Sequence, residues 1–137
     1  MVPGKPLNAR QRARIARAVQ AAEDWTGLEF CVYLGPADGD PRAHAEALMA
    51  DLGLTEAPAV LLLVAPEERR LEIVTSPAAA QRISDHEAQL AAVSMSASFG
   101  VGDVAGGVAE GVRLLAQFAG RGERIGPELP DVLDGTR

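Results

Sequence analysis

The feature that most constrains the fold is an unbroken run of seven apolar residues, Ala59–Ala65, with the sequence AVLLLVA. The run is too short to cross a bilayer, which takes about 20 apolar residues. A continuous apolar run of this length is typical of a β-strand that is covered on both faces. A polar turn, residues 66–70, separates it from a second apolar run at residues 71–74. We therefore expect an antiparallel hairpin at the centre of a sheet.

The residues before this hairpin predict a strand and a helix that join it in a βαβ unit. Residues 28–34 are dense in bulky apolar side chains, which predicts a strand. Asp40 and Pro41 form an N-cap followed by a first-turn proline, and they predict a helix to about residue 52. Because short links join these elements, we expect the two strands to be parallel, with a right-handed crossover.

Capping signals mark the other helices. Asn8 and Gln11 form a capping box for a helix that runs to about residue 24 or 25. Thr26-Gly27 ends it, since glycine tolerates the left-handed exit. A short helix is expected after residue 76. Ser84 begins a second capping box, S-x-x-E, for a helix to about residue 99. Asp103 is an N-cap for the last long helix.

Apolar residues at helical spacing predict which face of each helix is buried. The expected inward residues are Ile15, Val19 and Ala22 in the first helix, Leu90, Val93 and Ala97 in the helix that begins at Ser84, and Val104, Val108, Val112 and Leu115 in the last helix. Gly106, Gly107 and Gly111 weaken the last helix by about 1 kcal/mol each relative to alanine. As compensation, we expect the backbone of this helix to approach the sheet closely. We expect Trp25 to cover the core, with ligand binding as the alternative.

Together these elements predict an α/β fold, a three-layer α/β/α sandwich around a small mixed β-sheet. Residues 1–7 are expected to be a flexible N-terminus and residues 8–119 a single domain. For residues 120–137 we expect a loosely ordered tail or a strap along the surface.

Charge and cysteine content exclude several kinds of partner. The net charge of −6 repels phosphates and anionic lipid, so we expect neither nucleic acid nor a membrane as a partner. The first residues lack the apolar segment of a secretory signal, and the expected location is the cytoplasm. Cys31 is the only cysteine, which excludes an intramolecular disulfide and a multi-cysteine metal site. Within its apolar run, we expect Cys31 to be a small buried hydrophobe.

No stretch of the chain carries a specific catalytic motif. The patterns G-x-x-x-x-G-K-[ST], H-E-x-x-H and G-x-S-x-G are all absent. The glycines of residues 100–106 invite comparison with a dinucleotide fingerprint, but the spacing between the second and third glycines is one residue too long. Arg69 and Arg70 in the hairpin turn are able to pair with a phosphate or a carboxylate. The alternative is that they serve solubility alone.

Acidic residues are the remaining candidates for a site. Asp38 and Asp40 follow the strand at residues 28–34, at the edge where ligands bind in open α/β sheets. Asp85 and Asp103 begin helices. Converging carboxylates would bind Ca²⁺ or Mg²⁺ through oxygen ligands. The alternative is structural: Asp40 and Asp103 as helix caps, Asp85 beside a helix N-terminus, and Asp38 as a solvated turn residue.

The order of these elements resembles the TPM domain, a family named after a thylakoid lumen phosphatase, a photosystem II repair protein and an acetylcholine-receptor modulator. The resemblance rests on the segment VLLLVAPEERRLEIVTS, on Ser84-Asp85 and on residues 99–103, and it covers residues 8–119. Details such as Gly35-Pro36 and Asp40-Pro41-Arg42 are most similar to small actinobacterial proteins of unknown function.

The resemblance implies an α/β/α sandwich. Because some TPM proteins are reported as acid phosphatases or Ca²⁺ binders, it also implies a site role for Asp85 and Asp103. The Asp-Asn-Gly that is usual in the family before the central strand is replaced here by Glu56-Ala57-Pro58. The glycine-rich segment that is usual after the third strand is replaced by Thr75-Ser76-Pro77-Ala78. We therefore expect a non-catalytic domain with an interaction or regulatory role, bound to a protein partner or to copies of itself. The alternatives are a metal-dependent acid phosphatase acting on phosphomonoesters and a Ca²⁺-binding module.

Overall fold

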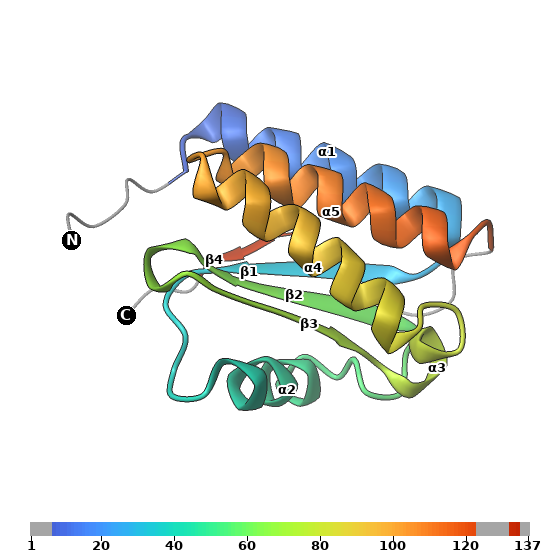
Figure 1. The fold of residues 1–137 in the computed structure, drawn as a ribbon. Helices are drawn as coiled ribbons and strands as arrows, with labels where there is room; N and C mark the ends of the chain where they lie inside the picture. Colours follow the sequence, from blue (N-terminus) through green and yellow to red (C-terminus); the bar gives the residue numbers. More distant parts are fainter. Residues whose placement is uncertain (1–6, 123–131, 135–137) are drawn as a thin grey trace.

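The computed structural model describes residues 7–122 and 132–134, and within them four strands form one mixed sheet (Figure 1). The strands are β1 (Glu29–Leu34), β2 (Ala59–Ala65), β3 (Arg70–Thr75) and β4 (Val132–Asp134), in the order β3-β2-β1-β4. β1 runs parallel to β2 and to β4, whereas β2 and β3 are antiparallel. The predicted hairpin and the predicted parallel pair are confirmed.

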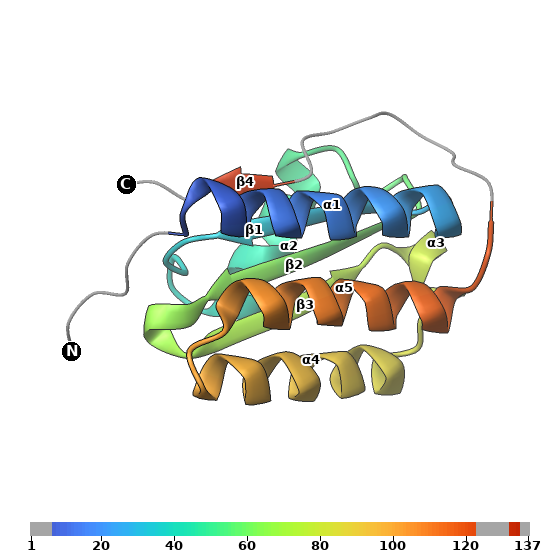
Figure 2. The ribbon, with the colours of Figure 1, turned by 90° about the horizontal axis from the view of Figure 1, so that it is seen from above.

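Helices cover both faces of the sheet, so the fold has three layers (Figures 1 and 2). One face carries α1 (Ala9–Thr26), α4 (Asp85–Gly100) and α5 (Val104–Ala119), and the other carries α2 (Pro41–Asp51). The short helices η1 (Pro66–Glu68) and α3 (Pro77–Ala80) lie before and after β3. In Figure 2, α5 lies between α1 and α4, parallel to α1 and antiparallel to α4. The predicted α/β class is confirmed.

The predicted capping residues begin their helices. Asn8 Oδ1 accepts a hydrogen bond from the Gln11 N–H at 2.8 Å, and Gln11 Oε1 accepts one from the Asn8 N–H at 2.8 Å. Ser84 and Glu87 make the same reciprocal pair at the start of α4. Each cap satisfies an N–H group that has no partner within its helix. α1 ends at Gly27, whose φ of 76° is left-handed as predicted.

The sheet separates two hydrophobic cores because side chains alternate along its strands. Phe30 and Leu62 are fully buried against α1, α4 and α5. Cys31 and Leu61 point to the opposite face and pack with Met49 of α2. The expectation that Cys31 is a buried hydrophobe is confirmed. β2 is buried along its whole length, as its continuous apolar sequence predicts.

The predicted inward face of α4 is wrong. Leu90 is 47% exposed and Val93 is 58% exposed, and Ala97 is exposed as well. The residues of α4 that are fully buried are Ala91 and Met95. α4 has apolar residues all round, so periodicity alone could not decide which side faces the core.

The predicted close approach of the α5 glycines is to α4, not to the sheet. A Cβ atom on Gly111 would overlap the side chain of Met95, and one on Gly107 would lie 2.8 Å from the Cβ of Ser98. These glycines therefore let α4 and α5 pack closely, and this packing fixes Met95 as the inward residue. Gly106 is a glycine for a different reason: a Cβ atom there would overlap the side chain of Asp103, which caps α5. The apolar face of α5 is confirmed, with Val108, Val112 and Leu115 fully buried and Val104 partly buried.

Two features differ from the prediction: the strand β4 and the position of Trp25. β4 adds a parallel strand beside Val32–Leu34 of β1, within the stretch expected to be a tail or a surface strap. Residues 123–131 and 135–137 of that stretch, like residues 1–6, lie outside the described residues. Trp25 is 46% exposed instead of covering the core, and Arg121 lies over its ring at 4.7 Å.

Candidate functional site

The loop after β1 holds two of the four acidic residues predicted from the sequence. Asp38 and Asp40 are both exposed. Asp40 Oδ2 accepts a hydrogen bond from the Ala43 N–H at 2.9 Å and so caps α2. The Asp38 N–H donates to Nδ1 of His44 at 2.8 Å, and Asp38 is exposed. Asp40 therefore has the predicted capping role, and a metal-ligand role for either carboxylate stays a prediction.

The other two acidic residues lie at opposite ends of α4. Asp85 is the first residue of the helix, and Asp103 follows its last turn and caps α5 through the Gly106 N–H at 3.0 Å. A helix of 16 residues is roughly 24 Å long, so α4 keeps these two carboxylates apart. Within residues 7–122 and 132–134, no three His, Cys, Asp or Glu side chains gather at a spacing that would hold a metal ion. Metal binding by these four residues stays a prediction.

Contacts between neighbouring loops organise the carboxyl end of β1. Glu68 of η1 accepts a hydrogen bond from the Ala37 N–H at 3.3 Å, which ties the hairpin turn to the β1–α2 loop. The Tyr33 hydroxyl donates to the Pro36 carbonyl at 2.8 Å, and its ring meets that of His44 edge-on. Arg69 and Arg70 lie exposed at the hairpin and do not join these contacts.

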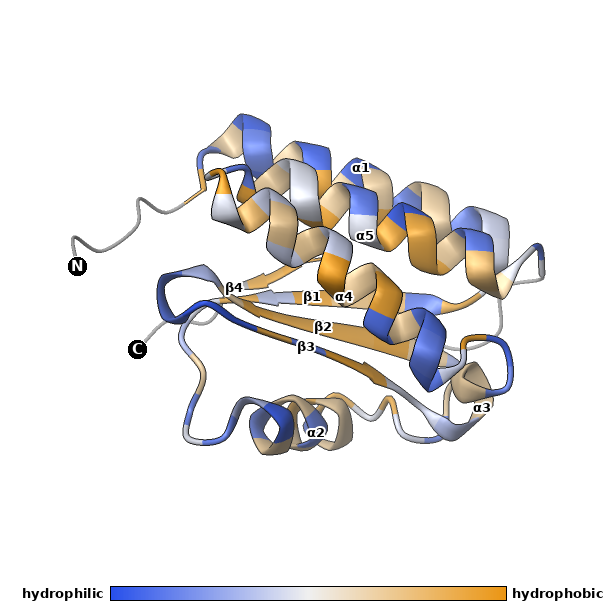
Figure 3. Cartoon of the chain, in the orientation of Figure 1, coloured by the Kyte–Doolittle hydropathy of each residue, from blue (hydrophilic) through white to orange (hydrophobic). Residues whose placement is uncertain are grey.

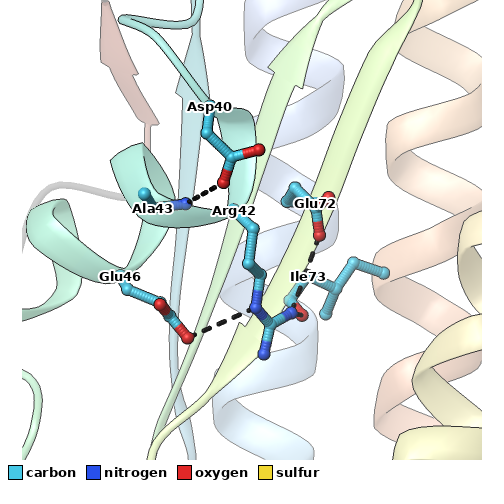
Figure 4. A network of polar contacts seen from close by, with 6 residues as sticks. All are labelled: Asp40, Arg42, Ala43, Glu46, Glu72 and Ile73. Atoms are coloured by element: carbon cyan, nitrogen blue, oxygen red, sulfur yellow. Dashed lines mark hydrogen bonds and ion pairs between the residues drawn. The ribbon is translucent and has the colours of Figure 1, made fainter.

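Arg42 links α2 to the free edge of β3 (Figure 4). Its Nη1 donates to the Ile73 carbonyl at 2.9 Å, and its guanidinium pairs with Glu46 at 3.4 Å and Glu72 at 3.6 Å. Ladder hydrogen bonds use every second residue of β3, and the Ile73 carbonyl points away from β2. Arg42 thus covers an acceptor that an added strand would use. Its i,i+4 spacing to Glu46 is a signal of the ion pair that sequence reasoning did not use.

A groove between α1 and α5 hollows the described surface. Its volume is about 620 Å³, and it is open on its outer side. Small residues form much of its lining, among them Ala18, Ala22, Ala109 and Ala116. The size falls within the range of ligand-binding pockets, about 300–1,000 Å³.

Larger polar and aromatic side chains stand around this lining. Arg14 comes from α1, Arg113 and Glu110 come from α5, and Trp25 lies where α1 ends. Arg113 Nε donates to Glu110 Oε2 at 3.1 Å, and this hydrogen bond raises the pKa of the Arg113 guanidinium above its ordinary value. Arg121 extends the positive charge beyond Trp25. The groove therefore offers small apolar residues, one aromatic ring and several guanidinium groups.

Sequence reasoning missed this groove because its walls come from segments about 90 residues apart. One signal was available. Arg10, Arg12, Arg14 and Arg17 place four of the thirteen basic residues of an acidic chain in the first half of one helix. Such a cluster indicates an electropositive face on an otherwise negative molecule.

The fold and this groove define an α/β domain with helices on both faces of a mixed sheet and a helix-lined groove on the outer side of one layer. The chain belongs to the DUF5130 family, a domain of unknown function whose family model matches residues 1–116. Among the residues that the structure describes, no helix has both the length and the hydrophobicity needed to cross a membrane.

Solved structures of bacterial proteins share this fold. The BA42 protein from the psychrophilic bacterium Bizionia argentinensis matches with a TM-score of 0.84 and 20% identity, over 97% of this chain and 98% of that one. The N-terminal domain of a P. gingivalis protein matches with a TM-score of 0.72 and 20% identity, over 82% of this chain and 75% of that one. The N-terminal domain of the cg2496 protein from Corynebacterium glutamicum matches with a TM-score of 0.68 and 17% identity, over 96% of this chain and 82% of that one. At these identities the likeness shows the fold alone.

Proposed function

We propose that this chain is a non-catalytic binding module, and that the groove between α1 and α5 receives an acidic amphipathic helix of a partner protein. The observation that carries this proposal is the combination of small lining residues with Arg14, Arg113 and Trp25 around them. Small residues let a helix approach closely, while guanidinium groups pair with carboxylates on its flanks. The surrounding charge favours an acidic partner over a basic one.

The shape of the groove favours a helix over a small ligand. Pockets for small molecules bury most of the surface of their ligand, and a groove that is open along one side does not. α1 and α5 run side by side, so a third helix laid between them would contact both (Figure 2). Aromatic and arginine side chains are also the residues that most often anchor protein interfaces.

The lining of the groove argues against catalysis there. It contains no serine, cysteine or histidine, and its one carboxylate, on Glu110, is paired with Arg113. A nucleophile and a neighbouring base, which covalent hydrolysis requires, are therefore not present in the groove.

We keep the resemblance to the TPM domain as part of this proposal. The order of strands and helices along the chain, on which that resemblance is based, supports it. The phosphatase and Ca²⁺-binding alternatives that it implies would need Asp85 and Asp103 in one site. Because α4 separates these residues, we favour binding over either alternative.

Trp25 provides a direct test because it is the only tryptophan of the chain and it lines the groove. Two synthetic helical peptides serve as probes, with the same leucine seam flanked by glutamate in one and by lysine in the other. We expect the glutamate peptide to change Trp25 fluorescence at lower concentrations than the lysine peptide, with an affinity that falls as salt rises. Equal binding of both peptides, or no binding of either, would contradict the proposal.

A matched pair of charge reversals locates the interaction. Arg14→Glu is expected to weaken binding of the glutamate peptide about two- to fivefold, since the lost attraction and the added repulsion together amount to about 0.5–1 kcal/mol at an exposed site. Arg70→Glu makes the same charge change at an exposed position of the hairpin, away from the groove. An equal loss of affinity in both variants would mean that net charge, and not the groove, determines binding of the peptide.

A further inference from the structure

The outward face of α4 carries a stripe of apolar residues. Leu90, Val93, Ala97 and Val101 follow one another at spacings of three, four and four residues. Val101, just after the helix, is 83% exposed, and Leu90 and Val93 are also exposed. Among the described residues, three of the four large hydrophobic side chains recorded as exposed lie on this stripe.

The same stretch is free of charge. No charged residue occurs between Ala88 and Gly102, although the chain has a net charge of −6. Figure 3 shows α4 as tan, orange and pale along its visible side, after a blue first turn. The opposite side of the helix is apolar as well, because Ala91 and Met95 pack into the core. Apolar side chains therefore lie on the exposed side of α4 as well as on its core side, together with the uncharged Gln89 and Ser96.

α4 lies where one more helix could pack beside the helical layer. It lies at the edge of the helical layer, with α5 on one side of it (Figure 2). The groove of the proposed function lies between α1 and α5, so α5 separates the two surfaces. The stripe is therefore an independent feature.

We propose that the α4 stripe is the contact between two copies of this chain. The spacing of three and four residues is the spacing with which two helices pack along a seam. A symmetric dimer brings the same patch of each copy together, which requires a patch that does not repel itself. The uncharged stripe meets this requirement, whereas copies with a charge of −6 repel one another through their charged faces.

Sedimentation velocity over a concentration series tests the dimer. Wild-type protein is expected to shift from monomer to dimer as its concentration rises. Val93→Glu, which buries a charge in the contact, is expected to weaken the dimer at least tenfold. Ala47→Glu adds the same charge at an exposed position of α2 and is expected to leave the dimer unchanged. Wild-type protein that stays monomeric up to 1 mM, or equal dimerisation of all three proteins, would overturn the proposal.

Site-specific crosslinking distinguishes this contact from other ways of covering the stripe. Oxidised glutathione would couple the thiols of two Val93→Cys chains into a disulfide, and would itself be reduced to two molecules of glutathione. Cys31 is buried and does not compete. We expect rapid formation of covalent dimer for Val93→Cys and slow formation for Ala47→Cys. Equal rates, or a stripe that instead binds vesicles of phosphatidylcholine as a monomer, would overturn self-association.

Discussion

Arg82 Nη1 lies 2.7 Å from the carbonyl oxygen of Thr26, at the C-terminal end of α1. The other terminal nitrogen of the same guanidinium donates to the carbonyls of Gly120 at 2.7 Å and Ala119 at 3.3 Å, where α5 ends. One cation therefore satisfies the terminal carbonyls of two parallel helices, which also carry the negative ends of their dipoles. These two helices form the walls of the groove, so Arg82 holds the groove in shape from one end.

Removal of this guanidinium should destabilise the protein. We expect Arg82→Ala to lower the free energy of unfolding by about 2–3 kcal/mol, since it removes charged hydrogen bonds and leaves helix carbonyls unsatisfied. Urea denaturation measures this change. Arg113→Ala removes an exposed ion pair and is expected to lower stability far less, because solvent screens the pair. A similar cost for both variants would show that Arg82 is not a clamp.

The contact between α5 and α4 predicts a strong difference between two glycines. Gly111→Ala places a Cβ atom against Met95 and is expected to lower stability by about 1–3 kcal/mol through overpacking. Gly100→Ala meets no atom within 4 Å, and we expect it to be neutral or to stabilise by up to about 1 kcal/mol. Thermal denaturation of the two variants measures the contrast. A tolerated Gly111→Ala would mean that the helices do not pack as described.

Substitutions of Asp103 distinguish a helix-capping role from a metal-ligand role. As a cap, Asp103→Ala should cost about 1 kcal/mol of stability, whereas Asp103→Asn should cost little because the amide oxygen still accepts from the Gly106 N–H. Chemical denaturation with and without Ca²⁺ measures both roles. If Asp103 were a metal ligand instead, Ca²⁺ would stabilise the wild-type protein, and both variants would lose that effect.

Substitution of Arg42 should change the aggregation of the protein as well as its stability. Arg42→Ala should lower the free energy of unfolding by about 1 kcal/mol and leave the Ile73 carbonyl open at the edge of the sheet. We expect faster aggregation on heating, followed by light scattering. Arg42→Lys keeps the charge but loses the planar fork, and it should give an intermediate result. Unchanged aggregation in both variants would contradict the role of Arg42 at the edge.

Local signals explain which parts of the fold were predictable. The caps at Asn8, Asp40, Ser84 and Asp103 depend on residues a few positions apart, and all four are confirmed. The hairpin was predictable because a strand buried on both faces leaves an unbroken apolar sequence.

Features that depend on distant segments were not predictable. The side of α4 that faces the core is set by Gly107 and Gly111 on another helix, and a helix that is apolar all round gives no preference of its own. β4 has three residues, too few for a periodic pattern, and it exists through pairing with Val32–Leu34. The groove needs α1 and α5 side by side, and neither helix alone shows a concave surface.

A variant that blocks the groove between α1 and α5 shows whether the helical peptide binds there. Ala21 lines the groove at an exposed position, so Ala21→Tyr fills it with an uncharged side chain without disturbing the core. Ala47→Tyr adds the same side chain on α2, on the other face of the sheet. Binding of the glutamate-flanked helical peptide, followed by calorimetry, is expected to fall more than tenfold in Ala21→Tyr and to match the wild type in Ala47→Tyr. Undiminished binding by Ala21→Tyr would show that the helix does not bind in the groove.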